Sequence, residues 1–498
     1  MPSALLALYL TLMGLCALHG VHRLVLVGIY LTRRRRSPLP ALPADLPFVT
    51  VQLPVFDERD VVERLVDAVA ALDWPANRLQ VQLLDDSTDD TPARAAPALE
   101  RARARGLDAT CHHRADRTGF KAGALAAGLR SARGELIAVF DADFVPAPDF
   151  LRRAVAPFAD PAVGMVQARW GHLNAGHSAL TAAQATLLDG HFVIEHTARH
   201  HGGRWFNFNG TAGVWRRACI EAAGGWEHDT LTEDLDLSYR AQLAGWQFVY
   251  QLDHVVPAEI PESLSAFRGQ QRRWAKGSVE VARKLGARIA GATHVPLATR
   301  TEALLHLWAN LAWPVALALA LVFPPLVYMR GGSPENALLY LPIFLVSTGA
   351  NLLFYAIAAP RRLAALPAAT LLGIGMAVNQ TFAVVEALWG YRTGFVRTPK
   401  SGGGRGSYRI SGWAPVPIEV GLAVLHLGTA VWAVNAADWG SVPFLLLFGG
   451  GFAWTGLAGL REALDARVSD DLGASLVQAS LVQASLVQPA VESPVTGK

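Results

Sequence analysis

Residues 136–143 of this 498-residue chain read LIAVFDAD, and this stretch decides the fold class. Five consecutive apolar residues are typical of a strand that is buried on both faces, as in a parallel sheet. Asp141 and Asp143 follow at the carboxyl end of that strand, the edge of an open α/β sheet where ligands bind. Because hard cations prefer oxygen ligands, two carboxylates at i and i+2 can bind one divalent ion. A solvated turn would look similar, and residues 234–236 hold a second Asp-x-Asp.

The sequence around this stretch predicts more strands, and these alternate with helices. Strands are expected at 49–53, 81–84 and 109–114. Helices are expected at 57–72, from 91 onward, and at 120–132. Asp57 can cap the first helix, and Pro92 stands in the first turn of the second, where proline is tolerated. Strands that alternate with helices form βαβ units, so residues 37–302 are predicted to be one α/β domain.

Further polar residues follow the predicted strands and are candidates for ligand binding. Asp85 and Asp86 end the second strand, where their carboxylates could accept hydrogen bonds from a nucleobase or a ribose. With Ser87 they could equally form a helix-capping loop. Lys121 lies among small residues in the string GFKAG and could meet a phosphate, although an ordinary exposed lysine would look the same.

Two strings in the second half of the domain have both a catalytic and a structural interpretation. Asp234 ends the string TED before an apolar helix, and it is either a general base or part of a capping cluster that the helix dipole favours. The string QQRRW occupies 270–274. Arg273 could hold phosphate oxygens and Trp274 could offer an acceptor a flat platform. A basic segment at a membrane surface is the alternative.

Apolar runs on both sides of this domain predict membrane-spanning helices. Residues 4–31 are long enough, since a span needs about 20 residues. The Arg33–Arg36 cluster follows this run instead of preceding it, which indicates an uncleaved anchor with the N-terminus outside and the arginines in the cytosol. Later runs occupy 303–329, 337–359, 365–390, 416–436 and 441–460.

One of the later runs, 365–390, is predicted not to cross the membrane. If every run crossed, the basic loop 391–414 would lie outside, against the positive-inside rule. The run also carries Glu386, and a glutamate deep in hydrocarbon costs at least a few kcal/mol. We therefore predict an interfacial or re-entrant helix, five true spans and a cytosolic C-terminal tail.

Composition excludes several other classes of protein. Hydrophobic residues make up 52% and charged residues only 17%, against about 25% in soluble domains. High apolar content and a net charge of +3 exclude a disordered chain, and that charge does not argue for nucleic-acid binding. Three cysteines without ligand spacing exclude a disulfide scaffold. Residues 461–498 contain Ala-Ser-Leu-Val-Gln three times and are predicted to be a disordered low-complexity tail.

The order of these motifs resembles the processive family 2 glycosyltransferases of the cellulose synthase superfamily. The shared pattern is three aspartate sites followed by Q-x-x-R-W. The resemblance extends in particular to the cellulose synthase-like A and C branch, which includes glucomannan 4-β-mannosyltransferases and β-1,4-glucan synthases. The strings that carry it are LDDSTD at 84–89, VQARW at 166–170, FNGTAGVWR at 208–216, TEDLDL at 232–237 and QQRRW at 270–274.

This resemblance implies an α/β GT-A (Rossmann-like) catalytic domain, in the cytosol, inserted between α-helical transmembrane segments. The chain would then divide into an anchor at 1–36, the catalytic domain at 37–302, a membrane region at 303–460 and the tail. The resemblance implies that Asp234 is the catalytic base, and that Asp141 and Asp143 bind Mg²⁺ or Mn²⁺. Residues implied to bind the nucleotide-sugar donor are Asp85, Asp86, Lys121, Asp141, Gln270 and Arg273.

The resemblance also implies an acceptor site and a mobile gating loop. The acceptor terminus would be lined by Phe208, Asn209, Gly210, Thr211 and Trp274. Gly210 would let the backbone approach closely. The gating loop has the pattern F-x-V-T-x-K, which Phe395, Thr398 and Lys400 match. Arg397 stands where valine is usual, which leaves open how the loop docks, and a plain basic loop is the alternative.

The implied function is inverting transfer of hexose from UDP-glucose or GDP-mannose to a growing β-linked, in particular β-1,4-linked, polysaccharide, which crosses the membrane as it grows. The implied partners are the UDP or GDP sugar, a polysaccharide or lipid acceptor, the membrane and accessory subunits, but no nucleic acid. The implied location is a bacterial inner (plasma) membrane. Two alternatives stay open: a non-processive enzyme that makes a glycolipid, and a transporter or scaffold whose domain is inactive.

Overall fold

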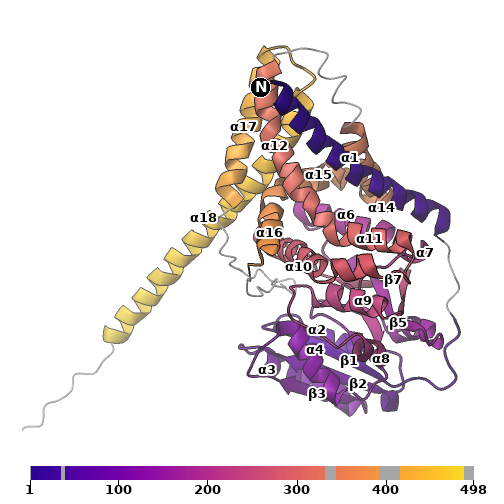
Figure 1. Cartoon of the computed structure of the whole chain (residues 1–498). Helices are drawn as coiled ribbons and strands as arrows, with labels where there is room; N and C mark the ends of the chain where they lie inside the picture. Colours follow the sequence, from indigo (N-terminus) through magenta and orange to yellow (C-terminus); the bar gives the residue numbers. More distant parts are fainter. Residues whose placement is uncertain (1, 35–39, 331–343, 392–414, 487–498) are drawn as a thin grey trace, which may run out of the picture.

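The structure is a computed structural model that describes residues 2–34, 40–330, 344–391 and 415–486. An α/β domain lies at one end of the molecule, and long helices from both ends of the chain stand together at the other (Figure 1). Between them lie α10 (Leu264–Gly291) and α11 (Leu297–Trp308). Helices α10 and α11 therefore connect the α/β domain to the helical bundle.

The domain is built on one seven-stranded sheet with the order β3-β2-β1-β4-β6-β5-β7. The strands are β1 Val49–Val55, β2 Leu79–Asp85, β3 Asp108–His113, β4 Leu136–Val139, β5 Val163–His172, β6 Gly213–Arg216 and β7 Gln247–Ala258. As the apolar run predicts, β4 is central and buried, and it runs parallel to β1. On its other side it pairs antiparallel with β6, so the sheet is mixed.

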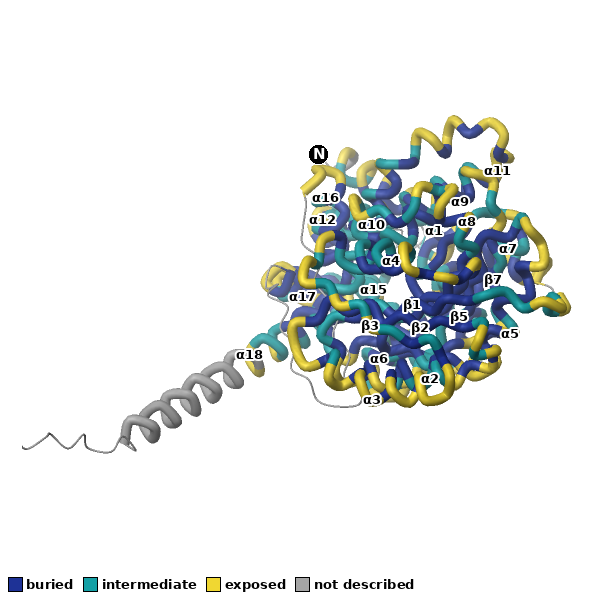
Figure 2. The backbone as a smooth tube through the Cα atoms, turned by 90° about the horizontal axis from the view of Figure 1, so that it is seen from below, coloured by how far each residue is buried: buried dark blue, intermediate teal, exposed yellow. Residues whose placement is uncertain are grey.

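Helices cover both faces of the sheet, which is buried through the middle of the domain (Figure 2). They are α2 Val62–Ala70, α3 Thr91–Ala104, α4 Phe120–Ser131, α5 Phe150–Val155, α6 Ala179–Asp189, α7 Thr197–His201, α8 Arg217–Ala222 and α9 Glu233–Leu243. Short turns of 3-10 or π helix are η1 Ala76–Arg78, η2 Ala156–Ala159 and η3 Gly190–His196.

The predicted start of the first domain helix is wrong. Helix α2 begins at Val62, not at Asp57. The Oδ1 atom of Asp57 instead accepts a hydrogen bond from the backbone N–H of Thr88 at 2.8 Å. Asp57 therefore ties the loop after β1 to the loop after β2, a long-range contact that capping preferences do not reveal.

The helical bundle contains α1 and the segments after α11. Their bounds are α1 Pro2–Arg33, η4 Ala309–Leu311, α12 Ala312–Arg330, η5 Leu345–Gly349, α14 Ala350–Ala358, η6 Pro360–Ala365, α15 Leu366–Gly375, α16 Ala377–Trp389, α17 Pro415–Asn435 and α18 Val442–Leu486. Among the described residues, four helices are long and apolar enough to cross a membrane: Ala4–Arg33, Leu297–Arg330, Pro415–Asn435 and Val442–Asp465. They correspond to four of the five predicted spans.

The other two predicted runs look different. Run 337–359 falls partly outside the described residues, and its described part holds the shorter apolar helix Leu345–Ala358. Run 365–390 is broken, with Pro360–Gly375 and Ala377–Trp389 bent by 44°. Glu386 in the second half forms an ion pair with Arg272 of α10. The bend and the ion pair are both compatible with a helix that does not cross.

The tail differs from its prediction as a disordered segment. Helix α18 continues without a break through the first two Ala-Ser-Leu-Val-Gln repeats to Leu486. Ala, Leu and Gln have good helix propensity, and the repeats contain no proline or glycine to end the helix. Low complexity alone therefore did not predict disorder here. Residues 487–498 lie outside the described part.

Candidate active site

A cavity of about 200 Å³ opens at the carboxyl ends of the central parallel strands. Its wall brings together residues from α4, α9, α10, the loop after β4 and the loop before β6, which are far apart in the sequence. Ten of the residues named from the sequence line it: Asp86, Lys121, Asp141, Asp143, Asn209, Gly210, Asp234, Gln270, Arg273 and Trp274. The ligand-binding edge that the βαβ pattern predicts is where this cavity lies.

Asp141, the first of the two aspartates after β4, is held by Lys121 and Thr211. The ammonium group of Lys121 binds Oδ1 of Asp141 and also donates to the carbonyl oxygen of Gly210 at 2.9 Å. The backbone N–H of Asp141 donates to Oγ1 of Thr211 at 2.8 Å. Burial alone would lower the pKa of Lys121, but Asp141 and neighbouring acidic groups raise it, so the ammonium stays charged. Lys121 thus places a positive charge inside the cavity.

The two aspartates that end β2 have separate tasks. Asp86 lines the cavity, and Arg114 grips both its oxygens, with Nε to Oδ1 at 2.7 Å and Nη2 to Oδ2 at 2.5 Å. Asp85 is fully buried and binds His113 Nδ1 at 2.5 Å and the backbone N–H of Ser87 at 3.0 Å. Asp85 therefore shapes the loop, and the cavity presents Asp86 alone.

Asp234 stands in the first turn of α9, with Oδ1 accepting the backbone N–H of Leu235 at 2.8 Å. Burial and the neighbouring carboxyl of Glu233 raise the pKa of Asp234 to about 7, against the opposing charge of Lys121. A group that titrates near neutral pH can both take and release a proton, as a general base must. Gly210 makes room for it: its φ is +80°, and a Cβ there would lie 3.1 Å from Asp234 Oδ2.

Helix α10 supplies the opposite wall. Gln270, Arg273 and Trp274 lie at i, i+3 and i+4, which is one face of a helix, and all three line the cavity. The ring of Trp274 lies 6.3 Å from that of Trp170, so two indoles stand side by side at this end. Trp170 was not predicted as a site residue, although it ends the string VQARW, which is a signal of its place in the site.

Two residues predicted to line the acceptor end do not reach the cavity. Phe208 is fully buried and packs edge-on against Trp215 at 5.5 Å. Thr211 is fully buried and holds the backbone of Asp141. Alternate residues of an extended segment point to opposite sides, and the left-handed turn at Gly210 further redirects the chain. Only Asn209 and Gly210 of this segment face the cavity.

One cation–π pair at the cavity edge was not predicted from the sequence. The guanidinium of Arg117 stacks over the ring of Phe56 with its carbon 3.3 Å from the ring centroid, and both residues line the cavity. They come from loops after β1 and β3, so no local pattern joins them. The gating-loop residues Phe395, Thr398 and Lys400 lie outside the described residues.

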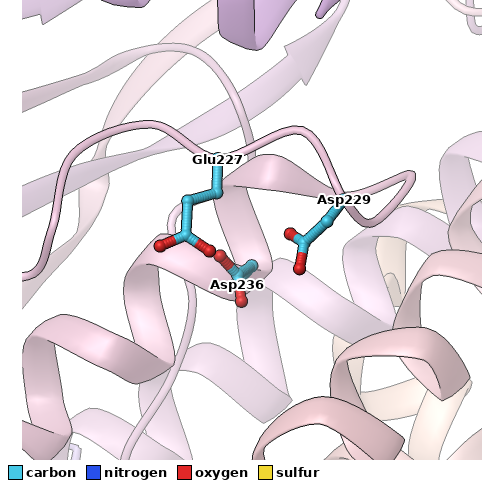
Figure 3. A group of neighbouring side chains, drawn as sticks. All are labelled: Glu227, Asp229 and Asp236. Atoms are coloured by element: carbon cyan, nitrogen blue, oxygen red, sulfur yellow. The ribbon is translucent and has the colours of Figure 1, made fainter.

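A second acidic cluster lies near α9 and consists of Glu227, Asp229 and Asp236 (Figure 3). Its geometry would suit a cation, but Lys284 already lies at its centre. The Nζ atom of Lys284 is 2.6 Å from Glu227, 2.7 Å from Asp229 and 3.0 Å from Asp236. Arg240 binds Asp236 as well, at 2.7 Å. The two aspartates of the second Asp-x-Asp therefore differ. Asp236 belongs to the ion-pair cluster, whereas Asp234 lines the cavity.

A substitution at Gly277 of α10 tests whether Thr232 positions Asp234 in the cavity wall. An added Cβ at Gly277 would lie 2.5 Å from both Oγ1 and Cγ2 of Thr232, which is buried just before Asp234. Gly277→Ala is expected to push the 232–234 segment outward and lower kcat by about 10-fold to 10²-fold, the usual effect of a misplacement of about 1 Å. Steady-state kinetics on the purified membrane protein would measure this.

The matched control is Gly286→Ala on the same helix, where the nearest atom to an added Cβ is 3.9 Å away. This change should keep activity and gain helix propensity of up to about 1 kcal/mol. Equal kinetics in the two variants would show that Thr232 does not position Asp234.

Comparisons with known proteins agree with this geometry. Residues 47–277 match the family model "Glycosyltransferase like family 2". Glucomannan 4-beta-mannosyltransferase 2 of Arabidopsis thaliana is 43% identical over 248 residues, which are 49% of this chain and 46% of that protein. Glucomannan 4-beta-mannosyltransferase 1 of Oryza sativa subsp. japonica is 40% identical over 297 residues, 56% of this chain and 57% of that protein. The chain thus spans about half the length of these curated relatives.

Among solved structures, mannosyltransferase PcManGT from Pyrobaculum calidifontis, in complex with GDP-mannose and Mn²⁺, is similar with a TM-score of 0.50 and 24% identity. The likeness covers 78% of this chain and 99% of that one. The fold and the cavity define a glycosyltransferase domain of the GT-A class. More particularly, the chain carries a glycosyltransferase family 2 domain, at residues 47–277. The fold class predicted from the sequence is confirmed, and the match at residues 47–277 agrees with the predicted family 2 domain.

Proposed function

We propose that this protein is a membrane-embedded inverting glycosyltransferase that adds hexose from a nucleotide sugar to a growing β-1,4-linked polysaccharide. GDP-mannose is the favoured donor, because the relatives described above are named for mannosyl transfer and the similar solved structure holds GDP-mannose. The observation that carries the proposal is the single cavity that gathers Asp234, Arg273, Trp274 and the Asp141–Asp143 pair. UDP-glucose is the alternative donor.

In the proposed mechanism each side chain acts on a different part of the reactants. Asp234 takes the proton from the acceptor hydroxyl, which then attacks the sugar carbon as the nucleoside diphosphate leaves. Trp274 and Trp170 offer flat faces to the sugar ring at the acceptor end. Arg273 and Lys121 hold the negative charge of the diphosphate. Asp86 faces the nucleoside.

The cavity also suits a divalent cation. Asp141 and Asp143 line it together, and carboxylate oxygens are the ligands that Mg²⁺ and Mn²⁺ prefer. A bound cation would neutralise developing charge on the leaving diphosphate. Because Lys121 binds Asp141, such an ion would share Asp141 with the ammonium group.

A second cavity, of about 570 Å³, supports a long acceptor. It shares Trp170, Asn209, Asp234 and Trp274 with the first cavity and continues between the bundle helices, where aromatic side chains line it. The aromatic residues of the bundle on this lining are Tyr9, Trp313, Phe323, Phe344, Phe354, Tyr355, Phe444 and Phe448. A polymer whose growing end lies at Asp234 could extend directly into this space. A lipid tail would also fit such an apolar space, so the glycolipid synthase is retained as the second candidate.

Product analysis tests the proposal. The purified full-length protein is incubated with radiolabelled GDP-mannose or UDP-glucose, in liposomes, and the product is extracted with organic solvent. Label that stays in the aqueous or insoluble fraction and is released by an endo-β-1,4-mannanase supports the proposal. Label in the organic phase would show a glycolipid, and transfer from neither donor would contradict the assigned activity. Activity restored only by a membrane extract would point to an accessory subunit.

We also propose that the catalytic domain is cytosolic and that segment 365–390 does not cross the membrane. Support comes from the ion pair of Glu386 with Arg272 and from the 44° bend in this segment. In a variant without Cys16, Cys111 and Cys219, single cysteines placed at 403 or 480 should resist a membrane-impermeant thiol reagent in intact cells. They should react after lysis.

Labelling of position 403 from outside would mean that the segment crosses. The assignment of Phe395, Thr398 and Lys400 to a cytosolic gate would then fail with it. Ser3→Cys at the start of α1 serves as the control, because it should label in intact cells under the same topology.

A further inference from the structure

The wall of the larger cavity contains a turn of π-helix, η3 (Gly190–His196). Such turns are rare and are found frequently at functional sites. This one places His191 and Glu195 on the lining of the larger cavity, next to Asn209. Asn209 lines both cavities and so stands at their junction, as Asp234 does.

The hydrogen bonds fix which way the amide of Asn209 points. Asn207 Nδ2 donates to the carbonyl oxygen of Phe208 at 2.9 Å, and a carbonyl can only accept, so the orientation of Asn207 is set. The same Nδ2 lies 3.2 Å from Oδ1 of Asn209. On the other side, Nδ2 of Asn209 lies 2.6 Å from Nε2 of His196. Oδ1 of Asn209 is therefore the atom that faces His191.

Both ring nitrogens of His191 then meet acceptors. Nε2 lies 2.9 Å from Oδ1 of Asn209, and Nδ1 lies 3.1 Å from Oε2 of Glu195. Burial alone would raise the pKa of Glu195, but Arg199 and His191 hold it well below its usual value, so this group is a carboxylate. A neutral imidazole has one N–H and cannot donate to both. The two contacts together require the imidazolium form.

We propose that His191 is a positioning residue for the acceptor, acting as an imidazolium that links Glu195 to Asn209 and so holds the Asn209 amide at the junction of the two cavities. This inference rests on the proposed function, which places the sugar acceptor at that junction. The role is to orient a side chain that binds the acceptor; proton transfer stays with Asp234.

The charges around His191 come from four elements. Glu195 and His196 lie on η3 itself, and Arg199 comes from α7. His19 and Arg23 of α1 and His306 of α11 line the same cavity, and Glu302 of α11 binds Arg199 at 3.0 Å. Burial lowers the pKa of His196 well below its usual value, so His196 is neutral and accepts from Asn209. Glu195 is the carboxylate in contact with the His191 ring and stabilises its second proton.

The first test replaces His191. His191→Gln cannot donate to Glu195 and Asn209 as the imidazolium does. The Michaelis constant for a mannooligosaccharide acceptor is expected to rise about tenfold, the value of one charge-assisted hydrogen bond. The Kd for GDP-mannose and the kcat at saturating acceptor should be unchanged. The matched control, His201→Gln on neighbouring α7, should leave all three values unchanged.

The second test changes Glu195 and keeps His191. Glu195→Gln removes the carboxylate that holds Nδ1 of the His191 ring, so the acceptor Michaelis constant should rise as it does in His191→Gln. The value of kcat at saturating acceptor should again be unchanged. ¹⁵N-histidine spectra of the native protein should also show one ring with both nitrogens protonated.

An unchanged acceptor Michaelis constant in His191→Gln or in Glu195→Gln would overturn the proposal. If His191→Gln does not fold, the Glu195→Gln kinetics and the spectra still decide. Failure of this proposal is distinguishable from failure of the proposed function, because the native protein would then still transfer sugar to the oligosaccharide. Absence of transfer by the native protein would refute the function instead.

Discussion

Asp234→Asn is expected to lower kcat by about 10²–10⁴, the usual contribution of a positioned base, and to leave the affinity for the nucleotide sugar nearly unchanged. The reason is geometric and electrostatic. Asp234 lies in the wall that both cavities share, where a growing chain end would meet the donor, and burial with Glu233 brings its pKa to about 7. Asparagine keeps the size of the side chain but cannot accept the acceptor's proton.

The pH dependence gives the same assignment a second readout. A base acts as the carboxylate, so kcat should rise with pH as Asp234 loses its proton near a pKa of about 7, and then level off. Asp234→Asn should lose this rise. The control Asp229→Asn changes an exposed carboxyl of the Lys284 cluster, which is outside the cavity, and should keep both rate and profile. If nucleotide affinity collapsed while turnover at saturation held, Asp234 would be a donor ligand instead.

Asp143→Asn is expected to reduce transfer at least about 10²-fold, since charge neutralisation by a cation at the diphosphate is worth several kcal/mol. The variant should still fold, because asparagine is close in size. Calorimetry with Mn²⁺ and GDP provides a readout that does not depend on turnover: the native protein should bind the two cooperatively and Asp143→Asn should not. Excess EDTA should reduce activity of the native protein in the same way, with recovery on adding Mg²⁺ or Mn²⁺.

Asp149→Asn is the matched control, because Asp149 follows the same strand further on but is exposed and outside the cavity. It should bind Mn²⁺ and GDP as the native protein does. Full activity in excess EDTA would contradict the metal assignment. Arg273 and Lys121 would then be left to hold the diphosphate alone.

The sequence by itself determined the first four strands and the edge of the sheet where the cavity lies. The run at 136–140 predicted a buried central strand because five apolar residues in a row suit a strand that is covered on both faces. The acidic residues after β2 and β4 were predicted to lie at the ligand-binding edge, because ligands bind at the carboxyl ends of the strands in such a sheet. Gln270, Arg273 and Trp274 were named because they match the string Q-x-x-R-W of the family that the sequence resembles. These are local properties of the chain.

The tertiary structure decided which of these side chains reach the cavity. Phe208 and Thr211 point into the core. Asp85 is buried and binds His113, so only Asp86 reaches the cavity. Glu386 pairs with Arg272, which is 114 residues away in the sequence. The tertiary structure also joined His191 to Asn209 and Glu195 across the junction of two cavities. Local patterns encode period and propensity, whereas the protonation and orientation of a side chain depend on partners that only folding brings within hydrogen-bond distance.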